Sequence, residues 1–476
     1  MRFGTVDLVV LLTYLVGVTA WGAWLGRGQK GGTDYFLGSR SLPWWAVMLS
    51  VVATETSTLT FLSIPGVAYM GSLVFLQLTL GYLIGRVLVS LLLLPAYYAG
   101  SLTTAYALLE ERFGLGARRF TSGVFMITRL LADSVRLFAT AIPLALITGW
   151  PYWISIAVIG ALTVIYTYFG GIKAVVWVDA LQMGLYLCGA AIAIIAIQTL
   201  VPGGWGEVFS SGRAAGKLDL IDLSFDLKVT YTLWAGVLGG AVFTMASHGT
   251  DQLIVQRLLT CRDLRSAQKA LVGSGVMVVF QFALFLIVGL GLWSFYGGRD
   301  FALPDEIFAL FIVEQLPPGV TGLLIAGVFA AAMSSLSSSI NALASATAYD
   351  YWAPMAGARD DEERVMKAGK AFTLLWATLL IVGAILFIPL SRGTSAVEVA
   401  LGIASLVYGG LLGAFALGVL TKRPGQRAVI IGMVVGIGSV TLIRDQIAWP
   451  WYVLVGSVLT FGVGSLVGLA AGKKTA

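Results

Sequence analysis

The stretch ATETSTLT, residues 53–60, places a carboxylate and five hydroxyl groups inside a run that is otherwise apolar enough to cross a membrane. Hydroxyls, together with carbonyl oxygens released where a helix unwinds, are the ligands that a hard cation such as Na⁺ accepts, and they also hydrogen-bond a polar solute. The stretch therefore predicts a cation or solute site in a water-accessible cavity. Glu55 either pairs with a basic residue or adds negative charge beside the cation.

A second polar cluster lies in AAMSSLSSSINA, residues 331–342. Ser334, Ser337, Ser338 and Asn341 fall on one helix face, and Ser335 lies beside it. Single serines in membrane helices commonly pack or bond to their own backbone. Four hydroxyls in five positions instead favour a sodium site shared with carbonyls at 53–56.

Seven ionisable side chains lie in predicted spans: Glu55, Arg86, Arg129, Asp133, Arg136, Asp179 and Asp251. Each costs about 2.5–3.5 kcal/mol at the bilayer centre and so needs a partner or a watery cavity. Arg129, Asp133 and Arg136 are spaced i, i+4, i+7, which favours an ion pair between the first two. Arg136 keeps spare donors, with which it either holds Glu55 or meets a carboxylate of a solute.

His248, the only histidine, lies in a third polar stretch, TMASHGTDQ, residues 244–252. A hydrogen-bonded packing role is favoured over proton coupling. Ser247 and Asp251 in the same stretch are candidates for gating or coupling, as is Glu55. Without a second histidine, a carboxylate cluster at metal-ligand spacing or a nucleophile–base pair, the sequence predicts no enzyme.

The composition is that of a polytopic all-α membrane protein: 476 residues, 58% hydrophobic and only 11% charged. Runs of about 18 residues or more can cross the hydrocarbon core as helices. Thirteen spans are expected, at 4–25, 44–68, 73–99, 120–147, 151–169, 175–200, 230–255, 270–295, 318–350, 368–390, 396–420, 426–443 and 449–471.

The basic residues predict the orientation, because Lys and Arg are retained on the cytoplasmic side. Of 30 basic residues, 20 fall in alternate loops, Arg257 being assigned to one of them, and seven fall on the opposite side. We expect a multi-pass protein of the plasma (inner) membrane with its N-terminus outside and its C-terminus in the cytoplasm. The same bias explains the net charge of +6, so a nucleic-acid partner has no further support.

The polar breaks in the second and seventh spans are separated by five spans, a spacing typical of inverted-repeat transporters. We therefore expect one transporter domain over 1–476. Its parts would be an extra N-terminal span and loop (1–43), a first repeat (44–200), a second repeat (230–420) and two C-terminal spans (421–476).

Five segments carry a resemblance to a known family: SVVATETSTLTFLSIPG, TAYALLEERFG, FGGIKAVVWVDALQ, TDQLIVQR and GLLIAGVFAAAMSSLSSSIN. In order and spacing they are similar to segments of the solute:sodium symporter family, and the chain most resembles the bacterial sialic acid transporter branch. The resemblance implies the leucine-transporter-type fold of two inverted five-helix repeats and alternating access around a central site.

The resemblance also implies where sodium, the expected cofactor, would bind. Its main site would use Ala53, Thr56, Ala331, Ser334 and Ser335. A second sodium site, found in the sialic acid branch, matches Asp179, Ser334, Ser337 and Ser338. Coupling to two sodium ions is therefore a reasonable hypothesis.

For the solute, the resemblance implies contacts at Ser57, Thr60 and Thr79, and an arginine on the span that carries Arg136. The chain departs from the branch in three places. The branch arginine aligns with Ala132, Thr79 replaces a glutamine, and Glu55 has no acidic counterpart in this branch, although the proline-transporting branch has an acidic residue there. The sugar-transporting branch has a Gln at the position of Thr60 and a Tyr at that of Ser247, so its sugar contacts are missing.

The sequence thus predicts a sodium-driven symporter for a small organic solute, with a carboxylate-bearing solute favoured over an amino acid or another neutral solute. A solute or sodium sensor without turnover is the alternative of another class. The expected partners are the solute, sodium ions and membrane lipid, and the expected state is a monomer.

Overall fold

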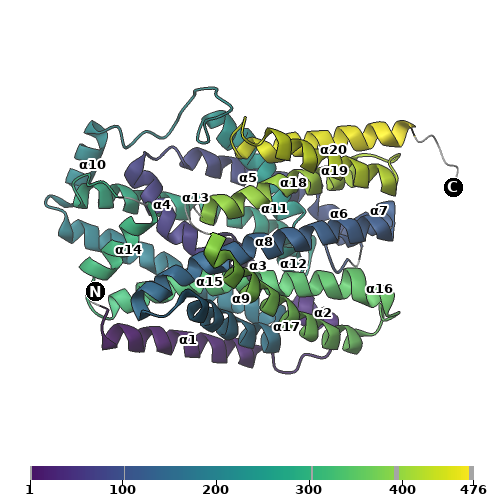
Figure 1. The fold of residues 1–476 in the computed structure, drawn as a ribbon, viewed down its shortest axis with the longest axis horizontal. Coiled ribbons are helices and arrows are strands. Elements are labelled where there is room, and N and C mark those ends of the chain that lie inside the picture. The colour runs from purple at the N-terminus through teal and green to yellow at the C-terminus, as the bar shows by residue number, and fades with distance from the viewer. Residues whose placement is uncertain (1–2, 101, 302–303, 391–395, 471–476) are drawn as a thin grey trace.

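A computed structural model describes residues 3–100, 102–301, 304–390 and 396–470. Within these ranges the secondary structure is helical, apart from one isolated β-bridge between Leu42 and Cys261. The helices run roughly side by side, and Figure 1 shows α3, α8, α12 and α15 near the middle, with α1 and α20 along opposite edges.

The helices up to residue 214 are α1 (Thr5–Leu25), α2 (Gly32–Leu37), η1 (Gly38–Arg40), α3 (Trp44–Glu55), α4 (Thr58–Met70), α5 (Leu76–Leu92), α6 (Leu94–Ala99), α7 (Ala107–Phe113), α8 (Leu115–Thr148), α9 (Tyr152–Leu200) and α10 (Gly204–Ala214). The remaining helices are η2 (Ala235–Gly239), α11 (Gly240–Gly249), α12 (Gln252–Leu258), α13 (Leu264–Phe295), α14 (Pro304–Gln315), α15 (Val320–Ala346), η3 (Thr347–Trp352), α16 (Ala353–Met355), α17 (Glu362–Phe387), η4 (Ile388–Leu390), α18 (Ala396–Leu420), α19 (Gln426–Ile443) and α20 (Pro450–Ala470).

Nine helices in the described ranges are long and apolar enough to cross a membrane, and the bent pair α3–α4 would make ten. The other predicted spans also coincide with helices. The 49-residue α9 contains two of them, interrupted at Gly171 (φ 55°, ψ −155°). The helix α8 is not among the nine, and α11 and α12 are too short to be recognised by length.

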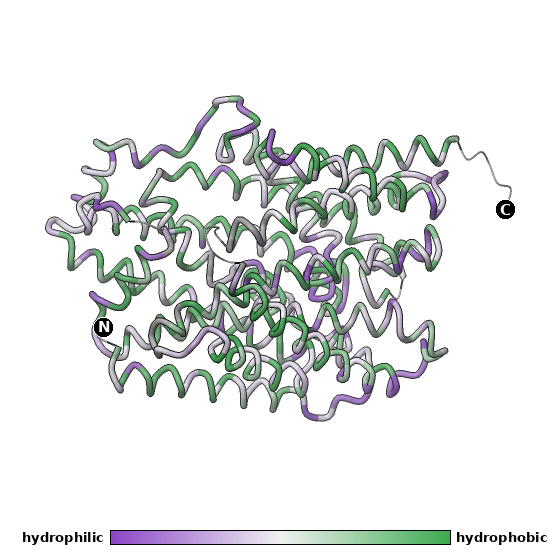
Figure 2. Tube along the Cα trace, viewed as in Figure 1, coloured by the Kyte–Doolittle hydropathy of each residue, from purple (hydrophilic) through white to green (hydrophobic). Residues whose placement is uncertain are grey.

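Hydrophobic residues cover most of the helices, whereas hydrophilic stretches gather mainly in the connections, as Figure 2 shows. Buried polar residues are numerous in α3, α8, α11, α12 and α15, and other helices contribute more of them, among them Arg86 of α5, Asp179 of α9 and Gln281 of α13. Two of these helices, α15 and α12, pack against each other and against α3. Part of the interior polarity therefore lies around the two places where spans are interrupted.

The C-terminal helices α18 and α20 approach at backbone distance. A Cβ atom added to Gly409 of α18 would lie 2.7 Å from Cα of Gly456 in α20. Small residues at such crossings let membrane helices pack backbone to backbone, which maximises van der Waals contact between them.

Candidate functional site

The first interruption separates α3 from α4. Thr56 and Ser57 lie between the helices with extended backbones (ψ 98° and 171°), and the helices are bent by 63°. Serine and threonine favour such openings because their hydroxyls compete for backbone hydrogen bonds. Carbonyl oxygens at the end of α3 have no intrahelical partner and are available to a ligand.

The second interruption separates α11 from α12 and falls inside the predicted polar stretch. Thr250 and Asp251 lie between the two helices. The Asp251 carboxylate accepts a hydrogen bond of 2.9 Å from Leu253 N and so caps α12. An acidic N-cap satisfies a backbone donor and interacts favourably with the helix dipole, which explains why α12 begins there.

Four of the five residues predicted for the main sodium site meet around one small cavity. Ala53, Thr56, Ala331 and Ser334 line it. Its volume of about 10 Å³ is that of a single water-sized particle. The fifth residue, Ser335, faces a neighbouring cavity, and its buried hydroxyl has no hydrogen-bond partner in the described part of the chain. Carbonyl and hydroxyl oxygens of this kind suit Na⁺.

The residues predicted for a second sodium site also meet, but around a guanidinium group. Asp179 accepts hydrogen bonds from Ser334 (2.7 Å) and from Arg257 (3.2 Å), and Arg257 also contacts the hydroxyl of Ser338. The Ser337 hydroxyl lies nearby and donates to Ser334 O at 3.0 Å. The assignment of Arg257 to a basic loop is wrong: Arg257 belongs to α12, which packs against α3 and α15, and its side chain is fully buried.

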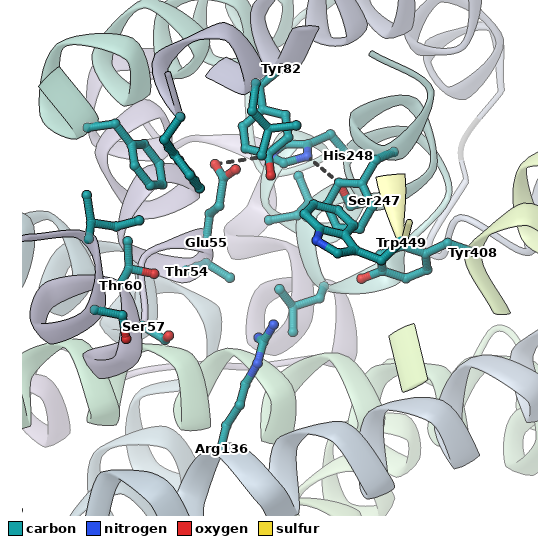
Figure 3. Close-up of a pocket in the computed structure, with 18 of the residues that line it drawn as sticks. Thr54, Glu55, Ser57, Thr60, Tyr82, Arg136, Ser247, His248, Tyr408 and Trp449 are labelled. Atoms are coloured by element: carbon teal, nitrogen blue, oxygen red, sulfur yellow. Dashed lines mark hydrogen bonds and ion pairs between the residues drawn. The ribbon is translucent and has the colours of Figure 1, made fainter. Parts of the chain in front are cut away.

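A larger cavity of about 210 Å³ lies between the two interruptions. Among the predicted site residues it is lined by Glu55, Ser57, Thr60, Arg136 and Ser247. Figure 3 shows Glu55 and Arg136 entering from opposite sides, with Ser57 and Thr60 on one flank and Ser247 on the other.

Thr79 lies away from the large cavity. Its side chain is fully buried, and its hydroxyl donates to Leu76 O of its own helix at 2.7 Å. Thr79 is not among the described residues that line this cavity, and its role as a solute contact stays a prediction.

Glu55 pairs with Arg86 of α5 rather than with Arg136. Arg86 is fully buried, whereas the Glu55 side chain is 18% exposed, toward the cavity. His248 completes the cluster: its Nε2 lies 2.9 Å from Nη2 of Arg86, and its Nδ1 lies 2.9 Å from the Ser247 hydroxyl. The histidine is hydrogen-bonded as predicted, and it also lines the cavity.

Arg129 binds Asp251 across the second interruption, and its distance to Asp133 is 3.6 Å. The expected pair with Asp133 is thus present, but Asp251 is the nearer partner. Asp133 also lies 3.5 Å from Arg136 and accepts a hydrogen bond of 2.6 Å from Ser339. The Arg136 side chain is 22% exposed and keeps donors directed at the cavity.

Sequence reasoning missed the aromatic wall of the cavity and the partner of Glu55. Tyr82 of α5, Tyr408 of α18 and Trp449, which directly precedes α20, line the cavity. The sequence identifies Arg86 only as an intramembrane charge. Its spacing of 31 residues from Glu55 lies far beyond helical neighbours, so no local signal could have joined the two.

The sodium:solute symporter family matches residues 35–436. The chain belongs to this family. It is a multi-pass membrane protein and a sodium-coupled solute symporter, not an enzyme, and sodium is its co-substrate rather than a resident cofactor.

Individual relatives resemble the chain over most of its length. The sodium/sialic acid symporter NanT of Aliivibrio fischeri is 29% identical over 475 residues, which cover 98% of this chain and 93% of NanT. The human sodium/iodide cotransporter is 30% identical over 452 residues, covering 91% of this chain and 69% of the cotransporter. A solved substrate-bound, outward-open sodium-coupled sialic acid symporter is 28% identical, with a TM-score of 0.89 and 98% of each chain covered. The leucine-transporter-type fold expected from the sequence is thereby supported.

Proposed function

We propose that the protein uses the sodium gradient to import a small carboxylate-bearing solute, whose carboxylate is held by Arg136. The observation that carries the proposal is the Arg136 guanidinium, which lines the large cavity and whose one ion pair with a described residue is that with Asp133, at 3.5 Å. A guanidinium offers five donors in a planar fork that matches a carboxylate. The named solutes of both curated relatives, sialic acid and iodide, are anions at neutral pH.

The proposed sodium ligands are those of the small cavity, with Ser335 beside it. The ion and the solute would then lie on two sides of the same opened helix, since Thr56 faces the small cavity and Ser57 the large one. Residues adjacent in an unwound segment move together. Binding of sodium would therefore preorganise the hydroxyls that meet the solute.

The proposed arrangement in the membrane has thirteen spans, with inverted repeats at 44–200 and 230–420, outside N-terminus and cytoplasmic C-terminus. The correspondence of helices with predicted spans supports the number, and the basic residues support the orientation. We propose a plasma-membrane monomer. Labelling of single cysteines introduced in the loops from each side of the membrane would test the orientation.

A second candidate solute is an amino carboxylate. Glu55 faces the cavity from the side opposite Arg136, and Figure 3 shows the two charges separated by the cavity. A carboxylate attracts an ammonium group, so a zwitterion would be held at both ends. Competition by an amino acid against the 2-hydroxy acid of the same shape separates the two candidates.

Uptake into proteoliposomes with an imposed sodium gradient tests the proposal, with sialic acid, lactate, leucine and glucose as probes and K⁺ replacing Na⁺ as control. Arg136→Gln should raise the KM of the transported carboxylate by about ten- to a hundredfold, because a charged hydrogen bond contributes about 1.5–3 kcal/mol. The matched control is Arg444→Gln, whose side chain is exposed outside the cavity. An unchanged KM would overturn the role of Arg136, and a complete absence of gradient-driven accumulation would favour a sensor.

A further inference from the structure

The ion pair between Asp179 and Arg257 is the most deeply enclosed charged group of the described residues near the sodium ligands. Both side chains are fully buried, with 3.2 Å between Nη2 of Arg257 and Oδ2 of Asp179. The pair joins α9 to α12. Neither residue of this ion pair lines the large cavity, so the solute proposal gives the pair no role.

The surroundings of this pair are rich in oxygen. Ser50 donates to Asp179 at 2.6 Å and accepts from Nε of Arg257 at 2.9 Å. Arg257 also donates to the Ser338 hydroxyl and, at 2.7 Å, to Leu253 O. A carboxylate, two hydroxyls and a carbonyl are the donor set that a hard cation accepts, and here a guanidinium is the cation that they hold.

A sodium ion and this guanidinium cannot share the carboxylate. Two positive charges about 4 Å apart in a protein interior repel strongly, because little water is present to screen them. The carboxylate cannot be left alone either, since an unpaired buried charge is costly. One cation must therefore leave as the other arrives.

We propose that Arg257 is a tethered counter-ion that holds the place of sodium at Asp179, and that sodium binds there only when the guanidinium withdraws. The proposal rests on the second sodium set, Asp179 with its serines, being accessible to the ion. Arg257 projects from α12, the short helix after the second interruption. Sodium occupancy and the position of α12 would then be coupled, and the sodium-free protein would never carry an unpaired Asp179.

The same geometry gives the tethered cation a place in the transport cycle. After releasing its ions and solute, a symporter must return empty to its starting conformation, and a buried carboxylate without a counter-ion would oppose that step. With Arg257 bound, Asp179 is neutralised both before sodium arrives and after it leaves. The arginine would thus permit the return of the unloaded protein while competing with sodium in the loaded one.

Equilibrium binding of radiolabelled sodium to the purified protein, without any solute, tests the competition. Arg257→Gln removes the competing charge and should bind sodium at least about tenfold more tightly than wild type, or bind one more ion. Arg257→Lys keeps the charge and should stay within about threefold of wild type. The double variant Asp179→Asn/Arg257→Gln has neither charge and should show no gain.

Unchanged sodium binding by Arg257→Gln would overturn the proposal, as would an equal gain in the double variant, because the gain would then not require the carboxylate. If Arg257→Gln does not fold, hydrogen exchange of residues 252–258 in the wild-type protein replaces it. Release of the guanidinium should speed exchange of α12 in Na⁺ relative to K⁺, and Asp179→Asn should abolish the difference. Equal exchange of wild type in both salts would overturn the proposal.

These measurements contain no solute, so an error in the proposed solute leaves their outcome unaffected. The variant Ser335→Ala distinguishes an effect at the main sodium site from an effect at Asp179, because the Ser335 side chain lies outside the Asp179 cluster. That variant should bind less sodium while keeping the difference between Arg257→Gln and wild type.

Discussion

Each interruption carries one carboxylate, and an arginine from another helix pairs with it. At the first, Glu55 pairs with Arg86; at the second, Asp251 pairs with Arg129. The two pairs differ in their access to the cavity. The Glu55 side chain is 18% exposed, whereas that of Asp251 is fully buried.

The two carboxylates also differ in how completely they are bonded. Asp251 receives hydrogen bonds from Arg129, from Leu253 N at 2.9 Å and from the Tyr408 hydroxyl at 2.9 Å. Glu55 interacts through Oε2 with Arg86 and His248, and its other oxygen has no hydrogen bond to the described residues. We call Asp251–Arg129 the sealed pair and Glu55–Arg86 the open pair. The sealed pair is suited to fixing helix positions, and the open pair to responding to a solute.

The largest effect is expected from breaking the sealed pair. Asp251→Ala leaves Arg129 buried without its nearest carboxylate and removes the cap of α12, so the free energy of unfolding in detergent should fall by about 3–5 kcal/mol. Asp251→Asn keeps the cap and should lose less. Thermal unfolding of both variants measures the difference, and a melting temperature equal to that of wild type would refute the structural role.

A smaller loss of stability, about 1–3 kcal/mol, is expected when the open pair is broken by Glu55→Gln, because cavity water can solvate part of the change. Its main effect should fall on the solute: KM for uptake changes, while the sodium affinity stays the same, since Glu55 lies outside the small cavity. Separate titrations of solute and sodium check this. A selective loss of sodium affinity would instead place Glu55 beside the ion.

His248→Gln is expected to cost under about 1 kcal/mol, because an amide can still bond to Ser247 and Arg86. Sodium-driven uptake should remain. In wild type, a proton gradient without sodium should drive no accumulation, and accumulation under those conditions would show that the histidine couples protons.

The smallest effect is expected at a pair outside the spans, where Lys173 lies 2.5 Å from Asp34. Burial would raise the pKa of the Asp34 carboxyl, but hydrogen bonds from Lys173 and Ser39 outweigh it and hold the pKa below its ordinary value. The pair therefore stabilises the protein above about pH 4, and this contribution is lost as the pH falls through the folded-state pKa. Asp34→Asn should lower the free energy of unfolding by about 0.2–1 kcal/mol at pH 7. It should also make the free energy of unfolding depend less on pH at acid pH.

The comparison of the two pairs also shows what the sequence can predict. Helices and their interruptions follow from apolar runs and from polar residues within them, because those signals are local. The partner of Glu55 does not follow, since Arg86 lies on another helix and helix packing alone decides which charges meet. The sequence places Arg257 in a loop because the expected apolar span ends at residue 255; only the packing of α12 against α3 and α15 shows that Arg257 is buried.

The close approach of α18 and α20 has a consequence for the sealed pair. Gly409, whose Cβ would meet the backbone of Gly456, directly follows Tyr408, the residue that donates to Asp251. A methyl group at position 409 would force α18 and α20 apart and move the Tyr408 phenol away from the Asp251 carboxylate. The position of the Tyr408 phenol beside Asp251 thus depends on the absence of a side chain where α18 crosses α20.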